Sequence, residues 1–145
     1  RSRRSIASRG CLSAVDVGAA RACPDKVLAH VKECQQFGQG IASFQLTRAK
    51  LADMEMEIDA ARLLLYRSAT LVDRGIPNNE ESTVANLCSS ETHMRAALNG
   101  MQLMGGWDYL VEHDMQRHFH ASKLAEVGGR TSEILRLVTS REMTR

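Results

Sequence analysis

Histidine and cysteine are the residue types in this sequence most able to do chemistry, and both occur in groups. His113, His118 and His120 lie close together in the last third of the chain. Grouped imidazoles could bind a metal ion, but residues two apart on a helix point away from each other. No cysteine or carboxylate stands at the spacing of a zinc finger. We therefore expect no metal site.

The four cysteines are Cys11, Cys23, Cys34 and Cys88. They form no Cys-x-x-Cys pair, and no secretory signal precedes them. This pattern favours free thiols, buried or at the surface, in a reducing compartment.

Composition excludes several classes of protein. The formal net charge is only +2, too small for nucleic acid to be held by bulk charge. No apolar run approaches the ~20 residues that cross a bilayer, so we expect no membrane span. Six aromatic residues and two prolines indicate a helical protein.

The first residues differ in charge from the rest of the chain. Arg1, Arg3, Arg4 and Arg9 precede the first acidic residue, Asp16. An arginine- and serine-rich, acid-free start is similar to the remainder of an organellar transit peptide, and it is equally compatible with one basic helix end. We therefore separate a basic segment, residues 1–8, from a domain of residues 9–145, and expect the mitochondrial matrix, with the cytoplasm as the alternative.

Any functional site must be positioned by the helices of the chain. The most clearly predicted of these is a helix of about thirty residues between Ser43 and Gly75. Ser43 is the expected N-cap, and Gly75 followed by Pro77 is a stop signal. Its inward positions step by three and four residues, as one helix face does; they are Leu51, Met54, Ile58, Ala61, Leu65, Ser68 and Val72.

Four further helices are expected. One opens after Asn78 and ends at Gly105-Gly106, another covers roughly residues 10–35 around Pro24, a short one covers 114–124, and the last begins at Thr131. The predicted inward residues of the first two are Val84, Leu87, Met94, Leu98 and Met101, and Val15, Val27 and Val31. No strand alternation appears, so we predict an all-α antiparallel four-helix bundle with a short extra helix.

Three segments carry a resemblance to a known family. They are residues 36–54, which include Phe37 and Gln45, residues 102–109, and residues 131–136. In this order and at these separations they resemble the C-terminal helical domain of the acyl-CoA dehydrogenases. Arg9 and Gly18 also match, so the resemblance spans about residues 9–143.

The resemblance implies a bundle that packs against its counterparts in a tetramer or dimer of dimers, with FAD at the seam between protomers. The residues that match cofactor-binding positions are Phe37, Gln102, Gly105, Gly106, Thr131 and Glu133. Adjacent glycines let backbone approach a pyrophosphate, and a helix N-terminus favours anions. A glycine pair is also an ordinary helix stop, and Phe37 could be an ordinary core ring.

The sequence departs from the family where the proton-abstracting base should stand. Gly129 occupies the position of the usual catalytic Glu, and Ser8 occupies the position of the alternative base on the first helix. A serine hydroxyl is too weak a base near neutral pH. Glu126 is the nearest carboxylate but lies three residues away, so we assign no catalytic residue.

Two further departures concern the cofactor. Cys34 stands where the family has an Arg that pairs with the pyrophosphate, and Asp108 replaces a Gly. Losing a cation and adding an anion both disfavour FAD, although Arg130, which replaces another glycine, could partly compensate.

These observations favour a non-catalytic assembly subunit, a homo- or hetero-oligomer built through its bundle faces within a larger complex. The alternative is the C-terminal piece of an FAD-dependent acyl-CoA dehydrogenase. The family's N-terminal helical and middle β domains would then come from the same chain or from another polypeptide.

Overall fold

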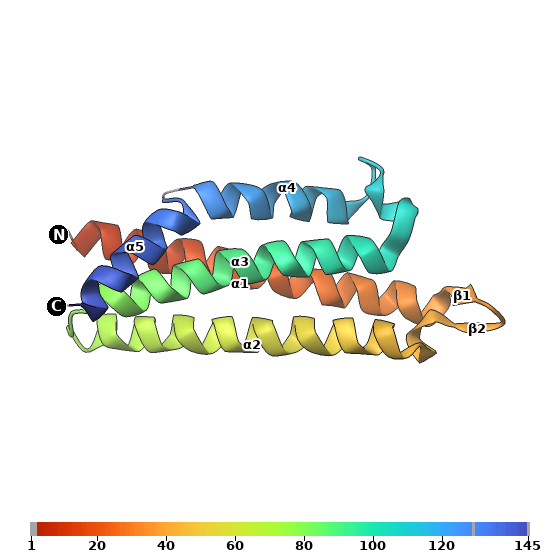
Figure 1. Ribbon diagram of the computed structural model, residues 1–145, viewed down its shortest axis with the longest axis horizontal. Coiled ribbons are helices and arrows are strands. Elements are labelled where there is room, and N and C mark those ends of the chain that lie inside the picture. Colours follow the sequence, from red (N-terminus) through yellow and green to blue (C-terminus); the bar gives the residue numbers. More distant parts are fainter. Residues whose placement is uncertain (1–2, 129, 145) are drawn as a thin grey trace.

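The computed structural model describes residues 3–128 and 130–144, with side chains from residue 9 onward. Five α-helices account for most of them: α1 (Arg3–Glu33), α2 (Gln45–Asp73), α3 (Asn79–Met104), α4 (Asp114–Val127) and α5 (Ser132–Met143). The first four run alternately up and down the long axis, and α5 lies across one end (Figure 1). The predicted all-α bundle is confirmed. None of the helices described is long and apolar enough to cross a membrane.

The ends of α2 confirm one predicted signal and correct another. Gly75 has φ +68°, and the N–H groups of Gly75 and Ile76 donate to the carbonyls of Val72 and Leu71, both at 2.9 Å. This left-handed termination is the one predicted. Ser43 is not the N-cap: that residue is Phe44, while the Ser43 hydroxyl donates to the Gly40 carbonyl at 2.7 Å. A 3₁₀ turn, η1 (Ile41–Ser43), uses Ser43 before α2 begins.

The helix α1 begins at Arg3, well before the predicted start near residue 10, and it contains Pro24. Val27 and Val31 are fully buried as predicted, but Val15 is 67% exposed. The inward positions near Val15 are taken by Ser13, Asp16 and Val17, so the start of the helix has a polar inner face that apolar periodicity could not reveal.

The central helix α3 packs against α1, α2, α4 and α5. Its predicted inward face is correct only in part, since Met101 packs against the core. Leu98 is 48% exposed, and the other four large residues of the predicted face are half-buried. Small and polar residues are buried instead: Ser82, Thr83, Ala85, Asn86, Ser89, Ser90, Thr92, His93, Ala96, Ala97 and Gly100. A helix enclosed on several sides needs small side chains so that its neighbours can approach, and Gly100 lies against Met115 of α4.

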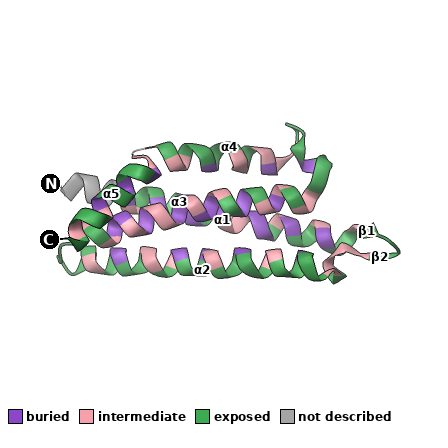
Figure 2. Ribbon diagram, viewed as in Figure 1, coloured by how far each residue is buried: buried purple, intermediate pink, exposed green. Residues whose placement is uncertain are grey.

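The apolar core lies where α1, α2, α3 and α4 meet, as the buried positions in Figure 2 show. Its fully enclosed large side chains include Val27 and Val31 from α1, Met54 and Ile58 from α2, and Met115 from α4. Fully burying each such side chain contributes about 1.5–3 kcal/mol. The apolar core is therefore concentrated in the half of the bundle that contains the second half of α1, and buried polar residues such as Ser13, Ser68 and Thr83 occupy the other half.

A short hairpin joins α1 to α2, where no strand was predicted. Strands β1 (Gln35–Gln36) and β2 (Gln39–Gly40) pair antiparallel. The turn residues Phe37 and Gly38 have φ of +54° and +78°, which is the backbone of a tight two-residue hairpin. Strands of two residues are too short to show an alternating pattern in the sequence.

Candidate functional site

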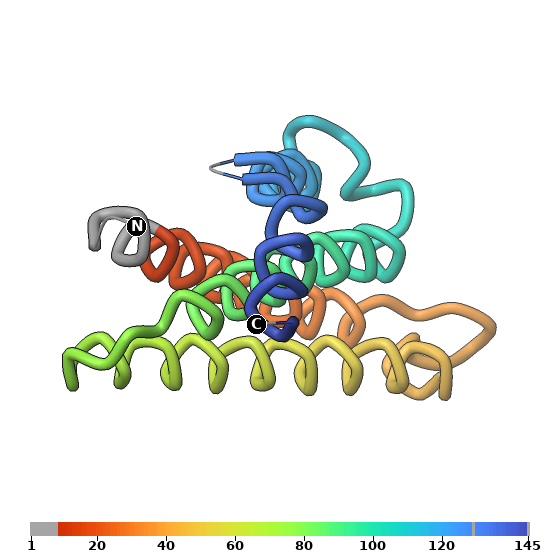
Figure 3. The backbone as a smooth tube through the Cα atoms, turned by 60° about the vertical axis from the view of Figure 1, so that its left-hand side comes forward, coloured from red at the N-terminus to blue at the C-terminus, as the bar shows by residue number. Residues whose placement is uncertain are grey.

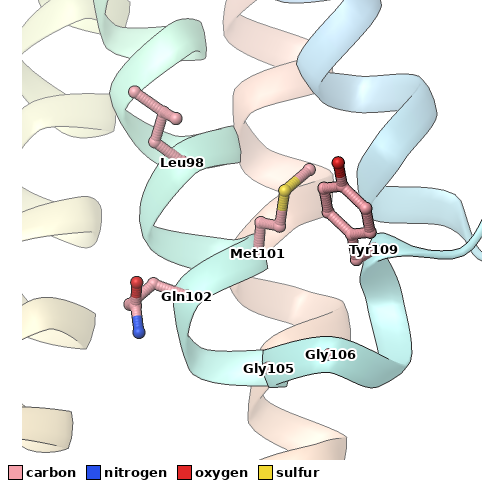
Figure 4. A pocket seen from close by; sticks show the side chains of 6 residues that line it. All are labelled: Leu98, Met101, Gln102, Gly105, Gly106 and Tyr109. Carbon is pink, nitrogen blue, oxygen red and sulfur yellow. The ribbon is translucent and has the colours of Figure 1, made fainter.

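The end of α3 forms an open groove of about 390 Å³. Gly105 caps the helix with φ +68°, and the chain continues as a 3₁₀ helix, η2 (Gly105–Tyr109). Figure 4 shows the lining side chains gathered around this turn: Leu98, Met101, Gln102, Gly105, Gly106 and Tyr109. The structure therefore places three of the predicted cofactor residues, Gln102, Gly105 and Gly106, in one groove.

The two glycines leave the backbone of the groove open. A Cβ atom added at Gly105 or Gly106 would meet nothing within 4 Å, so a flat ligand could lie against this turn. The N–H of Gly105, however, donates to the Met101 carbonyl. The groove walls are apolar apart from the Gln102 amide and the Tyr109 hydroxyl, and none of the six lining residues carries a cation. These features suit a neutral or aromatic part of a cofactor better than a diphosphate.

Asp108 does not line this groove. It is 2% exposed and lies with its Oδ1 3.8 Å from Nδ1 of His113. The His113 ring in turn lies 5.0 Å from the ring of Trp107. The carboxylate of Asp108 thus faces His113 and not the groove.

Phe37 lies at the tip of the hairpin, at the same end of the bundle as the groove (Figure 1). Its side chain is 94% exposed and meets Phe44 edge to face, with ring centroids 6.3 Å apart. It is therefore not a core ring. Cys34, half-buried at the start of the hairpin, is a free thiol.

Thr131 and Glu133 lie at the other end of α4, a helix of 14 residues that spans about 21 Å. Figure 3 shows α5 descending from that end across α3. The Thr131 hydroxyl accepts a hydrogen bond from the Ile134 N–H at 3.5 Å. Hydrogen bonds from its own backbone N–H and from Thr131 hold the pKa of Glu133 below its ordinary value. Thr131 caps α5 and Glu133 lies in its first turn. Within a single chain, these two residues are not brought together with the residues of the groove.

The structure describes no side chain at either position where the family carries its base. Gly129 lies outside the described residues, and Ser8 lies in α1 in the part where side chains are not described. Glu126 lies in the last turn of α4, where its Oε2 accepts a hydrogen bond from Lys123 Nζ at 2.7 Å. The carboxylate of Glu126, the nearest candidate for a replacement base, is therefore paired with a lysine.

Sequence reasoning missed Leu98, Met101 and Tyr109 as lining residues of the groove, and it missed a buried polar pair, Asp16 and His93. Leu98 and Met101 were predicted as inward residues of the helix, and Tyr109 lies in the segment 102–109 that carries the resemblance without being singled out in it. Within the described ranges, no group of three or more His, Cys, Asp or Glu side chains could hold a metal ion.

A family model described as the C-terminal domain of acyl-CoA dehydrogenase matches residues 6–144. The chain belongs to the acyl-CoA dehydrogenase family, as its C-terminal helical domain. A probable acyl-CoA dehydrogenase of Bacillus subtilis is 44% identical over 132 residues, 91% of this chain and 35% of that protein. The mitochondrial isovaleryl-CoA dehydrogenase of Solanum tuberosum is 36% identical over 91% of this chain and 32% of its own length.

Solved structures share the fold. Butyryl-CoA dehydrogenase of Megasphaera elsdenii superposes with a TM-score of 0.94 at 30% identity, over 97% of this chain and 37% of that one. PigA, solved with FAD and proline, superposes with a TM-score of 0.92 at 28% identity, over 97% and 37% of the two chains. The chain spans about a third of the length of the relatives it matches.

Proposed function

We propose that this acyl-CoA dehydrogenase-type bundle is a non-catalytic assembly module, which joins related subunits into a larger complex. The observation that carries the proposal is the distribution of apolar side chains. Exposed large hydrophobic residues outnumber buried ones among the described residues, and they occur on every helix. A monomer rarely leaves so much apolar surface to water.

The apolar surface has a definite location on α2. Met56, Leu63 and Tyr66 are 64%, 68% and 59% exposed, and their spacing of seven and three residues places them on one face of the helix. This face lies opposite the buried Met54, Ile58 and Ala61. A helix that is apolar on two faces needs packing partners on both, and among the described residues α1 and α3 pack against α2 while Met56, Leu63 and Tyr66 stay exposed.

The absence of a base at the family's two positions supports a non-catalytic role. Gly129 and Ser8 cannot remove an α-proton at neutral pH, and loss of a general base costs about 10²- to 10⁴-fold in rate. We assign the complex to the mitochondrial matrix, with the cytoplasm as the alternative; the relatives include a mitochondrial enzyme and a bacterial protein.

The test is the reduction of an artificial electron acceptor by acyl-CoA thioesters of several chain lengths, measured on the complex purified from its source. We expect no acyl-CoA-dependent reduction above that of a heat-treated sample. A matched preparation of a homologous dehydrogenase with its base intact is the positive control. Turnover within tenfold of that control would contradict the non-catalytic assignment, because tenfold is less than the loss of a base produces.

The groove at the end of α3 favours a second candidate, an FAD-binding piece of an active dehydrogenase. Gln102, Gly105 and Gly106 would lie along the flavin, and their open backbone fits such a ligand. When bound, FAD would supply the hydride acceptor, while this chain would orient the ring and exclude water. The groove and the pair Thr131 and Glu133 lie at different ends of α4. Each chain would therefore contact two cofactor molecules, and each cofactor would be shared with a neighbouring subunit.

Flavin content distinguishes the two candidates. A Gly106→Leu variant fills the groove, whereas Gly18→Leu adds the same side chain to an exposed position of α1. If the groove holds FAD, absorbance near 450 nm in the purified complex should fall by more than tenfold in Gly106→Leu and stay unchanged in Gly18→Leu. Equal flavin in both variants would remove the groove as a cofactor site.

A further inference from the structure

A cluster of buried titratable side chains connects α1, α3 and α4 and takes no part in the groove. Asp16 of α1 is 6% exposed and His93 of α3 is 2% exposed. Oδ1 of Asp16 lies 3.5 Å from Nδ1 of His93. Neither ring nitrogen of His93 has a hydrogen-bond partner. An imidazole enclosed in this way is costly unless a nearby charge offsets its desolvation.

The second histidine of the cluster comes from α4. The rings of His118 and His93 meet edge to face, with centroids 6.1 Å apart and an angle of 76° between their planes. Two imidazolium ions at this separation would repel each other strongly in a poorly hydrated interface. The ring contact therefore joins His118 of α4 to the buried pair that connects α1 and α3.

The charges that face His118 come from each element packed against α4. Lys26 of α1 forms an ion pair with Asp114, the first residue of α4. Arg117 adds a positive charge from α4 itself, and Asp108 of η2 adds a negative charge. Burial lowers the pKa of His118 from its ordinary 6.5, and the nearby His93, Lys26 and Arg117 lower it further, while Asp108 raises it.

We propose that Asp16, His93 and His118 form a proton-operated latch, which holds α4 against α1 and α3 while His118 is neutral and releases α4 when His118 is protonated. The docked state binds the proton less readily than the undocked state, so docking weakens as the pH falls below the ordinary pKa. The other contacts of α4 with the bundle include the buried Met115, the partly buried Phe119, the Lys26–Asp114 ion pair and a 3.4 Å contact between Ser122 Oγ and Met94 Sδ. Protonation of His118 weakens docking against the stabilisation that these contacts supply, so it shifts the docking equilibrium.

Amide hydrogen exchange of the full chain tests the latch directly. After correction for intrinsic exchange chemistry, opening of α4 should rise between pH ~7.5 and ~5.5, up to the limit of about tenfold that one histidine allows. The amides of α1, α2 and α3 should show a smaller change. Equal opening of α4 at the two pH values, or equal acceleration in all four helices, would overturn the proposal.

Two variants on α4 separate His118 from its surroundings. His118→Asn should abolish the pH dependence of α4 opening, whereas His120→Asn, on the exposed side of the same helix, should retain it. Imidazole titration by NMR gives a check that does not depend on how the variants fold. In the unmodified chain His118 should titrate below 6.5, and titration at or above that value would overturn the latch.

Discussion

The backbone of Gly105 is the residue-level feature on which the groove depends. Its φ of +68° and ψ of −155° belong to a region that is open to glycine and nearly closed to other residues. Gly106, its neighbour in the groove, does not have a positive φ. The two glycines therefore differ in what an added methyl group would do, although both have open space around them.

We predict that Gly105→Ala destabilises the chain by about 1–3 kcal/mol. Gly106→Ala, the matched control, should change the free energy of unfolding by less than about 0.5 kcal/mol. Urea denaturation followed by circular dichroism measures both. Equal destabilisation by the two variants would show that the termination of α3 does not depend on the backbone of Gly105.

The cysteines differ in reactivity for a physical reason. Burial raises the pKa of the Cys23 thiol to about 12, whereas Cys11 is exposed. At pH ~8 almost none of Cys23 is the reactive thiolate. Iodoacetamide should therefore label Cys11 on the folded chain and label Cys23 only after unfolding, as peptide mass spectrometry would show. Labelling of Cys23 at the rate of Cys11 in the folded chain would contradict its burial.

Several residue-level features could be predicted from the sequence because they follow from local backbone chemistry. One helix ends beside Gly75 and another at Gly105, and the last helix begins after Thr131, as the conformational preferences of these residues require. The burial of Asp16 and His93 could not be predicted, because nothing in a single chain marks a polar residue as inward-facing when its partner is 77 positions away.

At the scale of elements, α3 and α4 pack closely because the large side chain of Met115 lies against a glycine, Gly100. Met115 is completely buried, and its Sδ would lie 2.8 Å from a Cβ added at Gly100. The missing side chain of Gly100 thus makes room for the side chain of Met115. Methionine suits such a place because its three rotatable bonds let it fill an irregular gap.

Met115→Ala should lower the free energy of unfolding by about 2–5 kcal/mol, because it removes the transfer free energy of the side chain and leaves a cavity. The control is Met143→Ala at the end of α5, where the side chain is 75% exposed and takes no part in the core. Thermal unfolding by calorimetry compares the two variants. Equal costs for Met115→Ala and Met143→Ala would contradict the packing of Met115 between α3 and α4.

Hydrophobic periodicity predicted most of the inner face of α2, although Val72 near its end is 48% exposed, and it predicted α3 less well. Met54, Ile58 and Ala61 are buried because α2 has a single face against the bundle. The helix α3 has neighbours on several sides, so its inward positions are set by how closely those neighbours approach. Large residues such as Leu98 then lie at the margins, a result that only the arrangement of all five helices determines.

At the scale of the whole molecule, the resemblance predicted the fold, but not how the proposed cofactor residues are distributed over it; three of them are among the six residues that line the groove. Gln102, Gly105 and Gly106 lie together at one end of the bundle, and Phe37 lies at the same end. Thr131 and Glu133 lie at the other end of α4. Motif order along a chain carries no information about which end of a bundle each motif reaches, so the separation appears only in three dimensions.

The apolar surface is the feature that the proposed function must explain. Exposed large hydrophobic residues extend over α2, η2 and α5, for example Leu63, Trp107 and Leu137. In an assembly these surfaces are covered, and burying them supplies the free energy of association. The same surface on an isolated chain would favour aggregation.

Native mass spectrometry of the protein isolated from its source tests the assembly role most directly, because it counts chains and reveals bound flavin in one spectrum. The proposed function predicts an intact complex that contains at least two chains of this type or one such chain with a related subunit. A spectrum that shows this protein as a single unassociated chain would contradict it.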